Sequence, residues 1–183
     1  YMYGERWKRS NQLLNIYKKI IENPTSKQLI LQTWVPEDSE LNRRDCPCNL
    51  NYLLLCRNNK LDLTATIRSN DIMKGVKYDY FLAGFMLQSI ASWCNLKCGS
   101  LYFLINSIHV YEKDRNKLEN IVNNSIYNDV ITIKLPRVDI NKYWSDLRNL
   151  KKAEEASYNS NFDYCNKNIN DIETLIFRDF GRI

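Results

Sequence analysis

Four short motifs hold the side chains of this 183-residue chain that could do chemistry. An ionised thiol is a nucleophile or a metal ligand, and a guanidinium presents a fork of donors to carboxylates and phosphates. The motifs are Cys46-Pro47-Cys48, Arg68-Ser69-Asn70-Asp71, Asp79, and His109-Val110-Tyr111 with the chain's only histidine. Twenty residues separate Cys48 from Arg68, eleven more lead to Asp79 and thirty more to His109. If these residues form one site, the fold must bring them together.

The cysteines have two other interpretations. Cys46-x-Cys48 with Cys94-x-x-x-Cys98 lacks the spacing of the common zinc modules, so we predict no metal site. Cys56, Cys94 and Cys98 are interpreted as small core residues, with Cys94 at the end of a buried helix. Six cysteines in a chain of this length do not suggest a secreted disulfide scaffold, which favours a reducing cytoplasm.

The elements that would position the motifs follow from apolar periodicity. Residues 52–57 and 61–67 flank Asn58-Asn59-Lys60 and predict a β-hairpin, after which Arg68 follows directly. The second strand alternates apolar and polar residues, as a half-buried strand does. Residues 79–95 are apolar nearly all round, which predicts a buried central helix. A strand at 101–105 would lead to the histidine motif.

The remaining segments complete the expected order. Ser10 or Asn11 can cap a helix that ends at Asn23-Pro24. Its predicted apolar stripe consists of Leu13, Leu14, Tyr17, Ile20 and Ile21. We further predict a strand at 28–34, a polar loop at 36–44 with Arg43-Arg44 in solvent, a surface helix at 112–124, a strand at 130–135 and a helix from 140 onward.

Composition limits the class of protein. Hydrophobic residues make up 44% of the chain, enough for one substantial core, so a single domain over residues 1–183 is predicted. No apolar run approaches the roughly 18 residues of a membrane span, and no membrane partner is expected. A net charge of +5 with scattered basic residues suits a small anionic ligand, and we predict no nucleic-acid partner.

The order Pro-Cys, Arg-Ser-x-Asp-x-x-x-Gly and His-x-Tyr, at these intervals, resembles the thymidylate synthase family. Tyr3, Gly4 and Trp7 resemble the family's Tyr-Gly-x-x-Trp segment, which lies well inside the proteins of that family. The resemblance implies an α+β thymidylate synthase-like fold, with a mixed β-sheet packed on a long buried central helix and a homodimer formed through the sheet. It also implies that residues 1–183 lack the family's N-terminal third.

The resemblance assigns roles to the first motifs. In the family, a cysteine adds to carbon 6 of a pyrimidine, which makes carbon 5 reactive toward the one-carbon donor 5,10-methylenetetrahydrofolate. Cys48 matches this nucleophile, with a buried, unreactive thiol as the alternative, and Asn49 replaces the histidine that usually follows. Arg68 and Ser69 match residues that hold the nucleotide 5′-phosphate. Lys27 occupies one of two positions where the partner subunit supplies arginine.

Three further residues match the family pattern downstream. His109 and Tyr111 match the residues that hydrogen-bond the sugar 3′-hydroxyl, although a lone histidine is usually structural. Asp71 matches a carboxylate near the folate and the pyrimidine, with a loop-stabilising or helix-capping role as the alternative. Gly75 would permit a close approach of the backbone in the following turn.

Asp79 departs from the thymidylate synthases, which carry asparagine at this position. A protonated carboxyl can donate to N3 of cytosine and accept from its 4-amino group, whereas asparagine complements uracil. An unpaired buried polar group costs about 1–3 kcal/mol, so one residue can change the substrate. Aspartate here is similar to the phage deoxycytidylate hydroxymethylases of the family. The alternative is that Asp79 only caps the following helix.

We therefore expect an enzyme that hydroxymethylates carbon 5 of dCMP or CMP, with methylenetetrahydrofolate as donor and water completing the hydroxymethyl group. One alternative is a thymidylate synthase acting on dUMP, in which hydride from the folate gives a methyl group. Another is a non-catalytic nucleotide-binding or structural homologue, which Asn49 and the absence of the upstream residues favour.

Overall fold

The computed structural model of the protein describes most of the chain. The described residues are 3–40, 42, 45–124 and 139–159. The chain divides into two compact units, residues 1–132 and 133–183. The described part of the second unit contains one helix, α5 (Ile140–Tyr158), which confirms the helix predicted from 140 onward. The single domain over residues 1–183 stays a prediction.

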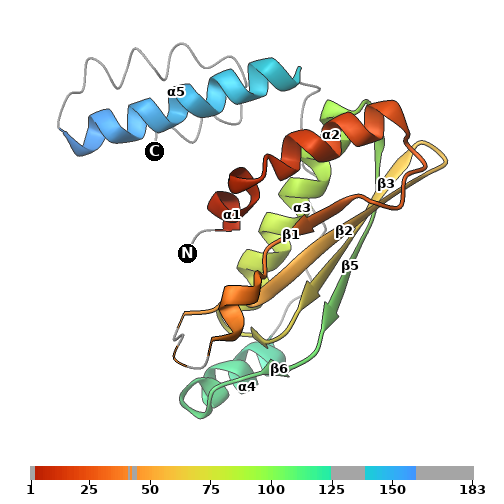
Figure 1. The fold of residues 1–183 in the computed structure, drawn as a ribbon. Coiled ribbons are helices and arrows are strands. Elements are labelled where there is room, and N and C mark those ends of the chain that lie inside the picture. Colours follow the sequence, from red (N-terminus) through yellow and green to blue (C-terminus); the bar gives the residue numbers. More distant parts are fainter. Residues whose placement is uncertain (1–2, 41, 43–44, 125–138, 160–183) are drawn as a thin grey trace. The chain divides into compact units, whose positions relative to one another are not determined.

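The first unit is built on a four-stranded mixed sheet with the order β1-β2-β3-β5 (Figure 1). Its strands are β1 (Ile30–Gln32), β2 (Asn49–Arg57), β3 (Lys60–Ile67) and β5 (Lys97–Ile105). The pairs β1–β2 and β2–β3 are antiparallel, and β3–β5 is parallel. Parallel neighbours need a crossover, which α3 (Gly75–Trp93) supplies. Helices and a mixed sheet confirm the α+β fold, although β1 is shorter and β5 longer than predicted.

The hairpin turn follows the sequence closely. Asn58 and Asn59 have φ of 49° and 59°, left-handed conformations that asparagine adopts more readily than most residues. Arg57 pairs with Lys60, so the turn has two residues and Lys60 already belongs to β3.

The two faces of the sheet differ because side chains alternate along each strand. The face in contact with α3 is apolar and closed, and its central row is Leu31, Tyr52, Ala65 and Phe103. The predicted alternation of β3 is confirmed, since its residues on this face are at most 1% exposed: Leu61, Leu63, Ala65 and Ile67. The opposite face carries the row Ile30, Leu53, Thr64 and Tyr102, in which the three large apolar residues are 40–52% exposed.

Helix α3 begins four residues before the predicted start and is not buried all round. Its second half is buried, through residues that include Met86, Leu87 and Ile90. Near its N-terminus, however, Tyr78 and Phe81 are 68% and 65% exposed. The predicted burial of the central helix is therefore confirmed for the second half and only in part for the first, because an apolar residue alone does not tell whether anything covers it.

The two N-terminal helices, α1 (Tyr3–Arg9) and α2 (Gln12–Glu22), precede the first strand of the sheet in the chain. Asn11 precedes α2 in a left-handed conformation, but its side chain makes no capping hydrogen bond. The predicted apolar stripe is partly wrong. Ile16, which it omitted, is 2% exposed, whereas Ile21 is 57% exposed.

The segment predicted as a polar loop contains a short 3₁₀ helix, η1 (Pro36–Ser39), and a buried ion pair. Asp38 is 3% exposed, and the Arg6 guanidinium donates to both of its carboxylate oxygens, at 2.5 and 2.9 Å. Arg6 also donates to the carbonyl oxygen of Thr33 at 3.0 Å. The pair therefore fastens α1 to the segment that leads into the cysteine motif.

The chain after β3 forms a second, two-stranded sheet, in which β4 (Asn70–Asp71) pairs in parallel with β6 (Ile108–His109). The predicted surface helix is confirmed as η2 (Glu112–Asp114) and α4 (Arg115–Asn124). The strand predicted at 130–135 and the Arg43-Arg44 pair lie outside the described residues.

The cysteines of the core are partly as predicted. Cys56 and Cys94 are buried, and Cys94 follows the last residue of α3. Burial raises the pKa of Cys94 to about 12. Cys98 is exposed at the start of β5, so its placement in the core was wrong. Among the described helices, none has both the length and the apolar character to span a bilayer.

Candidate functional site

Arg68 holds the cysteine motif against the end of β3. Its Nε donates to the carbonyl oxygen of Pro47 at 2.9 Å, and its Nη2 donates to that of Cys46 at 3.0 Å. The backbone N–H of Arg68 donates to the carbonyl oxygen of Cys48 at 2.9 Å. Its guanidinium lies over the Trp34 ring, 5.8 Å from the centroid. Within the described residues Nη1 makes no hydrogen bond, so Arg68 can position the motif and still offer a donor to an anion.

Cys48 is half-buried immediately before β2 and lies close to the Tyr3 hydroxyl. The Tyr3 hydroxyl accepts a hydrogen bond from the backbone N–H of Asn49 at 3.3 Å. Burial raises the pKa of Tyr3, and the negative charges of Asp79 and Cys48 raise it further against the effect of that hydrogen bond. Sequence reasoning used Tyr3 only as a mark of resemblance and did not identify it as a site residue. The Tyr-Gly-x-x-Trp segment was the available signal.

Asn49, the predicted substitute for histidine, is fully buried. Its Oδ1 accepts from the Thr33 hydroxyl at 2.7 Å, and that hydroxyl accepts from Trp7 Nε1 at 3.1 Å. Its Nδ2 is buried and has no hydrogen-bond partner within the described part of the chain. Asn49 thus brings an unused donor next to Cys48, and its catalytic role stays a prediction.

Asp79 lies inside α3, because the residue that precedes the helix is Lys74. The alternative that Asp79 is the N-cap is therefore wrong. Its Oδ2 accepts a hydrogen bond from Asn70 Nδ2 at 2.9 Å. Burial raises the pKa of Asp79, and the Asn70 hydrogen bond opposes that effect. A carboxyl with a raised pKa keeps its proton to higher pH than an exposed aspartate.

Gly75 lies close to the Asn70 side chain, whereas the predicted close approach concerned the backbone of the following turn and stays a prediction. A Cβ atom at this position would collide with the Asn70 side-chain oxygen, so glycine leaves room for the amide that contacts Asp79.

The β4–β6 pairing joins the second and fourth motifs. Asp71 lies opposite His109 in the register, and the N–H of Ile72 donates to the carbonyl oxygen of His109 at 2.9 Å. The His109 and Tyr111 rings are edge-on, with centroids 5.1 Å apart. Asp71 Oδ1 accepts from the backbone N–H of Met73 at 2.9 Å, so the carboxylate stabilises its own loop. Its proposed role near the ligands stays a prediction.

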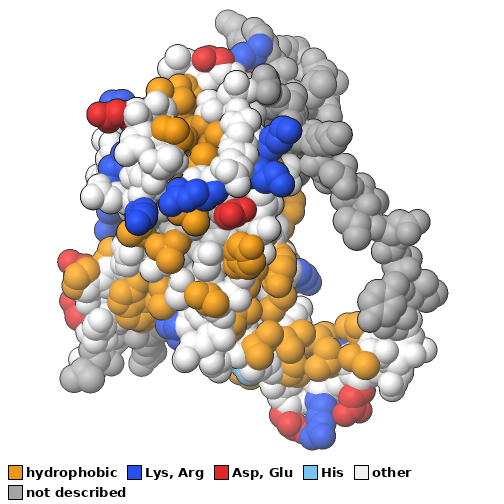
Figure 2. Space-filling view, turned by 90° about the vertical axis from the view of Figure 1, so that its right-hand side faces the viewer, with side chains coloured by type: hydrophobic (Ala, Val, Ile, Leu, Met, Phe, Trp, Pro, Cys, Tyr) orange, Lys and Arg blue, Asp and Glu red, His pale blue; other side chains and the backbone are white. Residues whose placement is uncertain are grey.

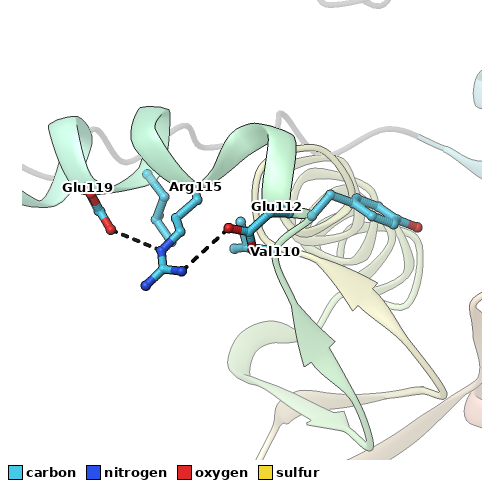
Figure 3. Close-up of a pocket in the computed structure, with 6 residues that line it drawn as sticks. Val110, Glu112, Arg115 and Glu119 are labelled. Carbon is cyan, nitrogen blue, oxygen red and sulfur yellow. Dashed lines mark hydrogen bonds and ion pairs between the residues drawn. The ribbon is translucent and has the colours of Figure 1, made fainter.

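A pocket of about 320 Å³ lies beside Tyr111, where the chain that follows β6 leads into α4 (Figure 3). Arg115 stands between two carboxylates here, 3.5 Å from Glu112 and 3.2 Å from Glu119. Because both partners are acidic and all three side chains are well exposed, we do not assign a substrate anion to Arg115.

For two residues predicted to bind the phosphate, the structure shows no side-chain contact that tests the prediction. Ser69 is half-buried next to Arg68, and Lys27 is exposed between α2 and β1. Neither side chain hydrogen-bonds to another described residue. The described residues also contain no group of three or more His, Cys, Asp or Glu side chains that could hold a metal ion.

A protein family and several known proteins match the sequence of this chain. A family model described as thymidylate synthase matches residues 1–163. The chain is 35% identical over 129 residues to a deoxyuridylate hydroxymethyltransferase of Bacillus phage SP01, which covers 61% of this chain and 33% of that protein. It is 29% identical over 127 residues to a putative thymidylate synthase of Methanosarcina barkeri, covering 67% of this chain and 58% of that protein.

A thymidylate synthase of Mycoplasma mobile is 25% identical over 154 residues, which cover 82% of this chain and 51% of that protein. The chain thus spans between 33% and 58% of the length of these three relatives. The matched region contains the cysteine loop under Arg68, the half-buried carboxyl of Asp79 and the paired motifs of β4 and β6. The chain therefore belongs to the thymidylate synthase family.

Proposed function

We propose that this protein transfers a one-carbon unit to carbon 5 of a cytidine monophosphate, dCMP or CMP, and gives the 5-hydroxymethyl nucleotide. The observation that carries the choice of base is Asp79, a half-buried carboxyl with a raised pKa. In its protonated form it can donate to N3 of cytosine while its other oxygen accepts from the 4-amino group. The family supports one-carbon transfer to a pyrimidine in general, and Asp79 supports the specific substrate.

The other site residues have roles that fit this chemistry. The Cys48 thiolate adds to carbon 6, and carbon 5 then acts as the nucleophile toward the donor. Arg68 Nη1 and the Ser69 hydroxyl bind the 5′-phosphate, with a charge-assisted contact from the guanidinium. His109 and Tyr111 bind the sugar hydroxyl. Asp71 lies near the base and the donor.

The family uses 5,10-methylenetetrahydrofolate as its one-carbon donor, and we propose it here as the second substrate. It supplies a carbon at the oxidation level of formaldehyde. Water adding to the resulting exocyclic methylene on the ring gives hydroxymethyl, whereas a hydride would give methyl.

A second candidate is the same reaction on deoxyuridylate, which the name of the phage SP01 relative favours. That candidate and a thymidylate synthase acting on dUMP both require uracil in the base site. An ionised Asp79 would face the O4 lone pairs of uracil, which is repulsive, so we place both second. A non-catalytic homologue would retain nucleotide binding without turnover, and the replacement of histidine by Asn49 favours that reading.

We also propose that the protein is a homodimer formed through the open face of its sheet. The face is apolar, with exposed fractions of 39–59% at Ile30, Leu53, Leu55, Tyr102 and Leu104. Hydrophobic side chains are gathered on the side of the molecule that Figure 2 shows, where β5 lies in Figure 1. Contiguous exposed apolar surface of this kind marks interaction sites. A twofold axis through this face would allow Lys27, just before the edge strand β1, to approach the partner's phosphate site.

The function is tested by tritium release. The full-length native protein is incubated with methylenetetrahydrofolate and with deoxycytidylate or deoxyuridylate, each labelled with tritium at carbon 5. We expect release from deoxycytidylate and a product whose mass corresponds to addition of a hydroxymethyl group. Faster release from deoxyuridylate would favour the second candidate, and no release from either nucleotide with normal binding would favour the non-catalytic homologue.

A further inference from the structure

Asn70 is the one residue of the Arg-Ser-x-Asp motif to which sequence reasoning gave no role, and it contacts the base-reading carboxyl. Its side chain is 2% exposed, and its Nδ2 donates to Asp79 Oδ2 at 2.9 Å. Its backbone is fixed as well, since its N–H donates to the carbonyl oxygen of Ser107 at 2.8 Å. The missing side chain of Gly75 leaves the space that the amide occupies. The amide is therefore held in one place by β4, β6 and the start of α3.

We propose that Asn70 is a positioning residue for base selection, which keeps Oδ2 of Asp79 unprotonated and so places the carboxyl proton on Oδ1. This inference rests on the proposed function. An oxygen that already accepts a hydrogen bond from an amide is the poorer site for a proton, and a carbonyl oxygen has two lone pairs. Oδ2 can then accept from Asn70 and from the 4-amino group of cytosine, while Oδ1–H donates to N3. Uracil, with a proton on N3 and an acceptor at O4, meets the wrong group at both positions.

The described titratable groups near Asp79 are neutral or carry no positive charge, so none of them competes with Asn70 in positioning the carboxyl proton. Burial raises the pKa of the Tyr3 and Tyr52 hydroxyls, and the nearby negative charge of Asp79 raises both further. Both hydroxyls are therefore neutral at pH 7. The Cys48 thiol lies near Tyr3 and carries no positive charge in either state. The pKa of Asp79 itself is raised by burial and lowered by the hydrogen bond from Asn70.

The test compares Asn70→Ala with wild type and with Asn106→Ala, an exposed asparagine beyond β5. All are made in the full-length protein. Carbon-13 NMR of the Asp79 carboxyl, without nucleotide, gives the pH midpoint of its titration. Calorimetry gives the affinities for deoxycytidylate and deoxyuridylate. In Asn70→Ala we expect the midpoint to move to higher pH. The preference for cytosine at pH 7 should nevertheless fall, by about tenfold, because either oxygen can then carry the proton and the carboxyl can also match uracil. Asn106→Ala should change neither quantity.

Gly75→Ala provides a second variant, which displaces the amide without removing it. It should lower the cytosine preference as Asn70→Ala does. Adding Asn70→Ala to Gly75→Ala should cause no further loss, because the new methyl group then has room. An unchanged Asp79 midpoint in Asn70→Ala, an unchanged base preference, or additive losses in the double variant would each overturn the inference. Equal wild-type affinities for the two nucleotides would instead overturn the proposed function, and the titration would still report whether Asn70 sets the carboxyl proton.

Discussion

Cys48 and Cys46 are two residues apart, yet the structure gives them different surroundings. Cys46 Sγ lies 3.3 Å from the carbonyl oxygen of Asp38, in a structural hydrogen bond, and its own carbonyl oxygen accepts from Arg68. Cys48 lies next to the hydroxyl of Tyr3, at the point where β2 begins. These contacts give Cys46 a part in building the loop and leave Cys48 as the thiol available for chemistry.

Replacement of each cysteine by serine separates the two roles. Cys48→Ser should lower tritium release from carbon 5 by at least on the order of a thousandfold, because a hydroxyl is a much weaker nucleophile than a thiolate. Cys46→Ser keeps a hydrogen-bond donor to Asp38 and should stay within about tenfold of wild type. Near-normal release from Cys48→Ser would show that the nucleophile has been assigned to the wrong residue.

Arg68 holds the cysteine loop and has a proposed contact with the nucleotide phosphate, and one substitution can distinguish the two. Arg68→Lys keeps the charge but cannot bind two loop carbonyl oxygens and a phosphate with a planar fork. It should weaken binding of the nucleoside monophosphate by roughly 10- to 150-fold, the range for a hydrogen bond to a charged group. Calorimetry with the monophosphate and with the nucleoside is the measurement. The nucleoside should lose much less affinity, and equal losses for both would remove the phosphate contact as the explanation.

At the scale of elements, the Arg6–Asp38 ion pair connects α1 to η1 and thereby to the cysteine motif. Its side chains are 3% and 0% exposed, so removing one partner strands a buried charge. Asp38→Asn should lower the free energy of unfolding by about 3–5 kcal/mol, measured by urea denaturation. The matched control is Glu119→Gln in the exposed pair with Arg115, where the change should be below about 1 kcal/mol. Similar effects at both sites would mean that the buried pair does not hold α1 in place.

The elements that the sequence predicts well are those whose periodicity is long and whose turns have a defined chemistry. The hairpin of β2 and β3 has clear alternation and two asparagines that adopt the left-handed turn conformation. Helix α3 is long enough for its type to be evident, but large apolar side chains in its first half, such as Tyr78 and Phe81, are exposed. The two-residue strands β4 and β6 are too short to give any periodic signal, and only the structure shows that they pair.

The residues of the site also divide into those that the sequence predicts and those that only the structure shows. The motifs predict Cys48, Arg68 and Asp79 as site residues, because each belongs to a recognisable pattern at a fixed interval. Asn70 could not be found this way, since its role depends on a side-chain contact with Asp79, nine residues away and on another element. Arg6 and Asp38 were also missed, because charged residues are expected at the surface and a buried pair is visible only once both partners are placed.

At the scale of the whole molecule, the open face of the sheet predicts the state of assembly. The native protein should sediment at twice the mass of one chain. Leu53→Glu, in the centre of the open face, should shift it to the mass of one chain, because a carboxylate would be buried without a partner. Ile121→Glu on α4, where the side chain is 54% exposed in the single chain, should leave the dimer intact. A wild-type protein that sediments as one chain, or equal dissociation by both variants, would contradict the assignment of this face.

In the proposed function, the choice of substrate depends on the proton of Asp79. Burial raises its pKa, so the protonated form that complements cytosine persists to higher pH than in an exposed aspartate. As pH rises through that pKa the carboxyl ionises, the donor to N3 is lost, and the preference for cytosine should decline. Two good hydrogen bonds and the avoided repulsion with uracil O4 amount to about 2–4 kcal/mol, or roughly 30- to 1000-fold in affinity.

Isothermal titration of the full-length protein and its Asp79→Asn variant, each with deoxycytidylate and with deoxyuridylate, tests this claim most directly. We expect the wild type to bind deoxycytidylate more tightly by roughly 30- to 1000-fold near neutral pH, and less selectively at higher pH. Asp79→Asn should move the preference toward deoxyuridylate while affinity for the phosphate stays the same. Wild-type binding that is equal for the two nucleotides, or tighter for deoxyuridylate, would contradict the account and favour a uracil nucleotide as the substrate.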